Sequence, residues 1–185
     1  PTMNKICFLD KDGTLVDNSQ YPEIIPSDKL LKNDVIEGLQ YLQKQGYKLI
    51  IVSNQSWVSK GKHTIERTKQ IFESLITQLK EYNIHIEEYY FCPHLRSMHC
   101  ECKKPNNKLI LEALKKYKGD PKKSLIIGDM DRDIIAGKRS GIKTVLVQTG
   151  CGKKFLDCDP DHIITNLNAI GEVIDEQNTK EHNKF

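Results

Sequence analysis

Several carboxylates in this sequence stand directly after short apolar runs, where a parallel sheet would bring them together. Asp10 and Asp12 follow the apolar run 6–9, and Asp129 follows the run 125–128. Ligands of open α/β sheets bind beyond the carboxyl ends of the strands. Like charges gathered at that edge repel one another unless a cation or a proton relieves them. The simplest remedy is a hard divalent cation such as Mg²⁺, which prefers oxygen ligands and usually works beside phosphate groups.

Two uncharged side chains and a lysine extend this pattern. Ser53 and Asn54 follow the apolar run 49–52, and Lys104 stands before Pro105 at the entrance to a predicted helix. The lysine would add a fixed positive charge beside the carboxylates. The motif Asp-x-Asp-Gly-Thr alone is also typical of an ordinary solvated turn. Four polar segments in this order favour a functional site instead.

A second group of candidate ligands is formed by cysteine and histidine. Cys92 and His94 form one close pair and Cys100 and Cys102 another, so that four ligands fall within the segment 92–102. Three thiolates and one imidazole make a closed ligand set for structural Zn²⁺. His99 could replace His94 in this set. We expect zinc to clamp a loop that lacks helix or strand, which also fixes the cations that follow it.

The predicted elements alternate between strand and helix along the chain. Their apolar runs are continuous, as is typical of strands buried on both faces of a parallel sheet. The sequence therefore predicts an α/β fold with three layers, α/β/α, around a Rossmann-like parallel sheet. We expect strands at 6–9, 48–52, 86–91, 124–128 and 143–147, and helices at 34–45, 64–82, 108–117 and 131–140.

Composition limits the partners that this chain can have. The 185 residues suit one domain over 1–185, with a polar tail at about 176–185 that we expect to fray. The net charge of +3 arises from 28 basic and 25 acidic residues, which argues against a nucleic-acid binder. No apolar run approaches membrane-spanning or signal-peptide length. We expect a cytoplasmic monomer that acts on a small molecule and contacts neither nucleic acid nor membrane.

The polar segments together resemble the four motifs of the haloacid dehalogenase superfamily, over about 8–150. The resemblance implies that Asp10 is a nucleophile that forms an aspartyl-phosphate and that Asp12 is the general acid and base. It also implies that Ser53 and Lys104 hold the phosphoryl oxygens.

The same resemblance implies a magnesium site. Its ligands would be Asp10, the main-chain carbonyl of Asp12, and Asp129. Asp133 follows Asp129 closely, and we expect it to orient the site rather than to bind the metal.

The cysteine loop narrows the resemblance to one branch of the superfamily, which contains phosphatases of heptose 1,7-bisphosphate and of histidinol phosphate. Members of this branch carry a zinc loop in place of a large cap domain. The segment 53–56 and the segment 147–150 favour the heptose bisphosphate enzymes, whereas the short span from Cys92 to Cys100 and the pair 108–109 favour the histidinol-phosphate enzymes. A zinc-containing module that binds a phosphometabolite without turnover is a further alternative.

The resemblance also implies substrate contacts beyond the catalytic groups. One segment would cover the substrate, a second would line its phosphate, and Lys103 would recognise its remoter part. Lys103 stands where an Arg is usual, and Met130 stands where a Lys commonly follows the metal aspartate. Because lysines are abundant near the predicted site, we favour a bisphosphate and therefore heptose 1,7-bisphosphate over histidinol phosphate. The covering residues would be Asn18, Ser19, Gln20 and Tyr21, and the lining residues Ser53, Asn54, Gln55, Ser56 and Lys104.

Overall fold

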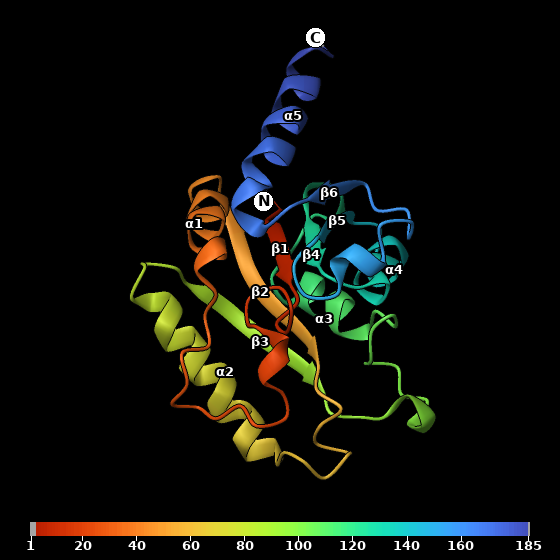
Figure 1. The fold of residues 1–185 in the computed structure, drawn as a ribbon. Coiled ribbons are helices and arrows are strands. Elements are labelled where there is room, and N and C mark those ends of the chain that lie inside the picture. The colour runs from red at the N-terminus through yellow and green to blue at the C-terminus, as the bar shows by residue number, and fades with distance from the viewer. Residues whose placement is uncertain (1–2, 185) are drawn as a thin grey trace.

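Short apolar runs form a six-stranded sheet in the computed structural model, which describes residues 3–184 (Figure 1). Every strand pair is parallel, and the order across the sheet is β3-β2-β1-β4-β5-β6. The first five strands confirm the predicted ones, with small shifts at their ends. The strands are β1 (Lys5–Leu9), β2 (Tyr47–Asn54), β3 (Ile86–Cys92), β4 (Leu125–Gly128), β5 (Lys143–Val147) and β6 (His162–Ile164).

Helices cover both faces of the sheet, which confirms the predicted three layers. Successive strand residues point to opposite faces, so that Cys7 and Leu9 pack into one apolar layer and Ile6 and Phe8 into the other. The first layer packs against α1 (Ile36–Lys44), α2 (Ile65–Lys80) and α5 (Ile170–His182), and the second against α3 (Lys108–Lys116) and α4 (Asp131–Arg139).

The helix ends follow local sequence with one exception. Thr64 caps α2, because its Oγ1 accepts the backbone N–H of Arg67 at 3.0 Å. Gly46 follows α1 with a φ of 89°, a conformation that favours glycine after a helix. The helix predicted over 34–45 begins later than expected: residues 33–35 form a separate 3₁₀ turn, and Val35 stands at the start of α1.

The C-terminal part of the chain differs most from the sequence prediction. β6 was not predicted, because three residues are too short to show a pattern. The tail was expected to fray, but α5 continues through it to His182. Ile170, Val173 and Ile174 bury the first turns of α5 against the sheet, and the backbone hydrogen bonds of the helix continue into the polar end.

Two long connections lie at the carboxyl edge of the sheet. Apart from isolated bridges of Val16 and Leu31, the segments 15–32 and 93–107 hold only short 3₁₀ turns, at Asn18–Gln20 and Arg96–Met98. In Figure 1 these connections lie at the lower end of the molecule, whereas the end of α5 projects from the opposite end.

Helix length and apolarity can be compared with what a bilayer requires. Across residues 3–184, none of the helices has both the length and the apolar character needed to cross a membrane.

Candidate active site

The position of β1 brings the predicted carboxylates together. β1 lies between β2 and β4, and all three strands run in the same direction. Asp10 after β1, Ser53 at the end of β2 and Asp129 after β4 therefore reach one edge of the sheet. The carboxylates of Asp10, Asp129 and Asp133 lie within 4.8 Å of one another, and all three residues are buried.

Lys104 lies inside this carboxylate cluster and links two of its members. Its Nζ donates to Asp10 Oδ1 at 2.8 Å and to Asp133 Oδ1 at 2.6 Å. A third hydrogen bond, of 2.6 Å, reaches the main-chain oxygen of Val52 in β2. Every donor of the ammonium thus has an acceptor, which fixes Lys104 beside Asp10.

This ion pair sets the charge of both partners. Burial by itself would raise the pKa of Asp10, but the Lys104 ammonium outweighs it and holds that pKa below its ordinary value. Burial by itself would lower the pKa of Lys104, but Asp10 and Asp133 outweigh it and raise that pKa. Asp10 is therefore kept as an ionised carboxylate, the form that can act as a nucleophile.

Asp129 has one satisfied and one unsatisfied oxygen. Its Oδ2 accepts the backbone N–H of Cys151 at 2.9 Å, whereas its buried Oδ1 has no hydrogen-bond partner among residues 3–184. Burial, followed by the charges of Asp10 and Asp133, raises the pKa of Asp129 to about 9. Gly13 packs directly against the Asp129 carboxylate, because a Cβ at position 13 would collide with it.

The donor set fits a magnesium ion. An unpartnered buried oxygen and crowded carboxylates are what a hard cation with oxygen ligands would satisfy. Asp10 and Asp129 supply two of the three ligands expected from the sequence, and Asp12 follows in the same turn.

Asp133 is held from two sides, as expected of a residue that orients others. Its Oδ2 accepts the backbone N–H of Met130 at 3.1 Å, and its Oδ1 accepts from Lys104. Gly128 leaves room for it, since a Cβ there would meet the Asp133 side chain. Burial and the charge of Asp10 raise the pKa of Asp133 to about 6.

Lys11 and Gln55 position the Asp12 carboxylate, a role that the sequence pattern predicted for neither residue. Lys11 Nζ donates to Asp12 Oδ1 at 2.6 Å and also contacts the Tyr21 hydroxyl. Gln55 Nε2 donates to Asp12 Oδ2 at 2.7 Å and to Ser53 Oγ at 2.8 Å. The Lys11 side chain is wholly buried, and its Nζ lies 4.9 Å from the centroid of the Tyr21 ring and 5.4 Å from that of the Phe72 ring. The sequence pattern alone gave no sign of this burial.

The residues at the end of β2 and directly after it alternate between buried and half-buried. Ser53 and Gln55 are each 1% exposed and bond to one another. Asn54 holds the main chain of Lys104: its Oδ1 accepts the Lys104 N–H at 2.9 Å and its Nδ2 donates to the Lys104 carbonyl at 3.0 Å. Ser56 is half-buried. Gln55 therefore faces Asp12 and Ser53, a position more suited to orienting them than to touching a substrate.

The segment predicted to cover the substrate lies over the same edge. Asn18–Gln20 form a 3₁₀ turn, and Ser19 and Gln20 are exposed. Tyr21 stacks on Trp57 with ring centroids 6.0 Å apart and an interplanar angle of 12°. Trp57 and Tyr21 thus join the connection after β1 to the connection after β2.

The predicted zinc ligands come together in the loop after β3. His94 Nδ1 lies 3.3 Å from the sulfurs of both Cys92 and Cys102, and Cys92 Sγ lies 3.5 Å from Cys100 Sγ. His99 lies outside this cluster, which resolves the choice of histidine in favour of His94. Three sulfurs and one nitrogen at such separations fit the closed set of a structural zinc site.

Thiol chemistry supports the same interpretation. Burial of Cys92 and its neighbouring sulfurs raise the pKa of that thiol. Burial opposes ionisation of Cys100 too, but the backbone N–H of Lys103 and the other thiols outweigh it and lower its pKa to about 6. A bound cation would allow all three sulfurs to ionise together.

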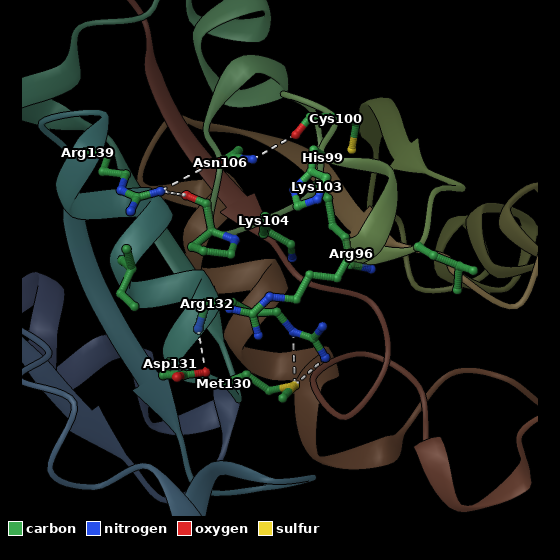
Figure 2. Close-up of a pocket in the computed structure, with 13 residues that line it drawn as sticks. Arg96, His99, Cys100, Lys103, Lys104, Asn106, Met130, Asp131, Arg132 and Arg139 are labelled. Carbon is green, nitrogen blue, oxygen red and sulfur yellow. Dashed lines mark hydrogen bonds between the residues drawn. The ribbon is translucent and has the colours of Figure 1, made fainter. Parts of the chain in front are cut away.

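A cavity of about 480 Å³ adjoins the carboxylate cluster between the cysteine loop and α4 (Figure 2). Lys104 borders both the cavity and the cluster. Lys103, predicted to meet the remoter part of a substrate, lines this cavity, and so does Met130, which follows Asp129. A molecule bound at Asp10 therefore has space to extend along the cysteine loop.

The fold and these motifs define a hydrolase of the haloacid dehalogenase type, and comparisons with known proteins agree. A family model described as HAD-hydrolase-like matches residues 101–170. A D-glycero-beta-D-manno-heptose-1,7-bisphosphate 7-phosphatase of Haemophilus influenzae is 36% identical over 155 residues, which are 80% of this chain and 84% of that protein. The chain belongs to the phosphatases of the haloacid dehalogenase superfamily.

Further relatives have the same printed activity. The enzyme of that name from Helicobacter pylori strain J99 is 33% identical over 150 residues, covering 80% of this chain and 85% of that protein. A crystal structure of D,D-heptose 1,7-bisphosphate phosphatase from B. bronchiseptica, complexed with magnesium and phosphate, superposes with a TM-score of 0.84 at 23% identity. That superposition covers 94% of this chain and 99% of that one and shows a shared fold.

Proposed function

We propose that this phosphatase removes the 7-phosphate of D-glycero-D-manno-heptose 1,7-bisphosphate through an aspartyl-phosphate on Asp10. The observation that carries the proposal is the ionised Asp10 beside Lys104, Asp129 and Asp133. Relatives of this chain are named as phosphatases of this sugar. The proposed substrate is a precursor of nucleotide-activated heptoses and of lipopolysaccharide.

Asp10 and Asp12 would carry out the bond-making and proton-transfer steps in both halves of the reaction. Asp10 attacks phosphorus while the ester bond to the sugar breaks, and Asp12 gives its proton to the leaving sugar oxygen. Asp12 then takes a proton from water, which attacks the same phosphorus and releases phosphate and the free Asp10 carboxylate. Lys104, which lies beside Asp10, and Ser53 would bind phosphoryl oxygens during both steps.

Two metal ions complete the proposal. Mg²⁺ held by Asp10, Asp129 and the Asp12 carbonyl would neutralise charge on the transferring phosphoryl group. Zn²⁺ held by Cys92, His94, Cys100 and Cys102 would be structural, keeping Lys103 and Lys104 in place.

Histidinol phosphate is the second substrate to be tested. It carries one phosphate and a cationic amine, and that amine would approach the positively charged side chains of the adjoining cavity, among them Lys103. Charge therefore favours a bisphosphate over histidinol phosphate.

The deciding experiment measures phosphate release from both compounds in the presence of Mg²⁺. We expect a clear preference in kcat/KM for heptose 1,7-bisphosphate, and loss of activity in Asp10→Asn. A preference for histidinol phosphate would replace the proposed substrate. No release from any sugar phosphate by the wild type would favour a binding module without turnover.

A further inference from the structure

Unpaired positive charge gathers in the cavity beside the carboxylate cluster. Arg96, Lys103 and Arg132 all line it, and Figure 2 shows the Arg96 side chain reaching from the cysteine loop toward α4. Among residues 3–184, no carboxylate lies within ion-pair distance of these three side chains. Like charges that line one cavity repel each other unless an anion separates them.

The other charged groups of the cavity already have partners. Lys104 is bound by Asp10 and Asp133, and Arg139 donates to the Pro105 carbonyl at 3.2 Å. Asp131, the one carboxylate among the lining residues, accepts the backbone N–H of Arg132 at 2.8 Å rather than its guanidinium. These groups do not neutralise the three unpaired cations.

Arg132 is the best placed of the three to bind an anion. Its guanidinium contacts only the Met130 sulfur among the described residues, with Nη2 at 2.7 Å and Nε at 3.2 Å, and a thioether is a weak acceptor. The side chain is half-buried and lines the cavity. Its charge helps to lower the pKa of Asp10, and burial together with Arg132 lowers the pKa of Lys103. Arg132 thus lies in electrostatic range of both the nucleophile and the cavity.

This arrangement suggests how the chain accommodates its unusual residue after the metal aspartate. Met130 carries no charge, but the Arg132 guanidinium, which donates to the Met130 sulfur, places a positive charge in the same part of the cavity. A guanidinium also presents two parallel donors to a phosphate, which an ammonium cannot.

We propose that Arg132, together with Arg96, binds the second, non-reacting phosphate of a bisphosphate substrate. The assignment rests on the proposed function, because it places the reacting phosphate at Asp10 and Lys104. Lys104 borders both sites, so a sugar bound there extends into a cavity lined by Arg96, Lys103 and Arg132.

The test compares heptose 1,7-bisphosphate with heptose 7-phosphate, which keeps the reacting group and lacks the other. Arg132→Ala should raise KM for the bisphosphate by about 10–100-fold and change KM for the monophosphate by less than about threefold. Arg96→Ala should show the same selectivity to a smaller extent, since Arg96 is exposed. Arg132→Lys should raise KM for the bisphosphate less than Arg132→Ala does, because lysine keeps the charge but lacks the two parallel donors of the guanidinium.

The control is Lys138→Ala, which removes one positive charge from the same helix outside the cavity. It should leave both KM values unchanged. Equal losses on both substrates in Arg132→Ala, or no loss on either, would overturn the proposal.

A binding measurement separates this proposal from the proposed function. If the wild type hydrolyses neither heptose phosphate, the proposed function is lost, and calorimetry on Asp10→Asn decides the role of the cavity. Fructose 1,6-bisphosphate should bind at least about tenfold more tightly than fructose 6-phosphate, and Arg132→Ala should abolish the difference. Equal affinities of the two sugars for the Asp10→Asn protein would overturn it.

Discussion

Lys104 shows how one side chain makes a crowded carboxylate site possible. It is wholly buried, yet it remains charged because Asp10 and Asp133 each accept one of its hydrogen bonds. Removal of one partner from a buried ion pair leaves an uncompensated charge, which costs more than an exposed pair does.

We therefore expect Lys104→Met to destabilise the protein by about 3–5 kcal/mol and to lower kcat/KM by at least about a hundredfold. Chemical denaturation and a phosphate-release assay measure the two effects. Lys122→Met, at an exposed position before β4, should change neither. Wild-type stability in Lys104→Met would show that the ion pair is dispensable.

Residue types and spacing predicted the central groups of the site but not their supports. Asp10, Asp129 and Lys104 stand next to strand or helix ends, so that knowledge of a parallel sheet suffices to place them at one edge. Lys11 and Gln55 act through contacts with residues far away in the sequence, and the pattern around them gives no sign of it.

At the scale of elements, β3 and α3 are joined by a carboxylate with three donors. Glu88 accepts from Lys116 Nζ at 2.8 Å, from the Tyr90 hydroxyl at 3.0 Å and from the Tyr117 hydroxyl. Burial by itself would raise the pKa of Glu88, but these donors outweigh it and lower that pKa.

This lowered pKa makes a contribution to stability that depends on pH. The ionised form is favoured in the folded state, so the contribution is present above the unfolded pKa of about 4.3 and is lost as pH falls through the lower folded pKa. The difference in unfolding free energy between wild type and Glu88→Gln should therefore shrink as pH falls from neutral. Denaturant titrations at several pH values measure it. A difference that is constant with pH would contradict the assignment, and Tyr117→Phe should weaken the dependence.

The cysteine loop is the element whose order we expect to depend most on a metal. It has one short 3₁₀ turn, and its cluster is followed directly by Lys103 and Lys104. Cys102→Ser should remove zinc, lower Tm and reduce kcat/KM by about 10–100-fold, because the lysines lose their support. Elemental analysis, thermal unfolding and activity measurements test this.

Cys158→Ser provides the control, since this half-buried thiol lies outside the cluster. It should keep wild-type zinc content and activity. Full activity in zinc-free protein would show that the loop does not need the metal.

Clear apolar patterns made most elements predictable, whereas very short or polar elements could not be predicted. The five longer strands and four of the helices carry clear patterns. β6 is too short to show one, and α5 combines three buried anchors with a polar end that resembles a frayed tail. The short turn before α1 depends on packing against the 3₁₀ turn at Leu167–Ala169, which lies far away in the sequence.

At the scale of the whole molecule, the site and the end of α5 lie at opposite ends (Figure 1). The anchors of α5 precede its exposed end, which makes few contacts with the rest of the protein. Removal of residues 177–185 should leave kcat/KM unchanged and alter the free energy of unfolding by no more than about 0.5 kcal/mol.

An anchor substitution gives the contrasting result. Ile174→Ala should cost about 2–4 kcal/mol, because it opens a cavity in the apolar layer under α1. Denaturant unfolding compares the two variants. A large loss of stability or of activity on truncation would mean that the exposed end of α5 has a role in the fold or at the site.

The central position of β1 has a consequence for how the enzyme comes apart. Asp10 follows β1, which has neighbours on both sides, whereas β6 is an edge strand that pairs only with β5. Local unfolding generally begins where few contacts protect the backbone. Opening that starts at β6 must pass β5 and β4 before it reaches the nucleophile. Amide hydrogens of β1 should exchange among the slowest in the protein. Catalysis should persist through fluctuations that already expose β6 at the edge of the sheet.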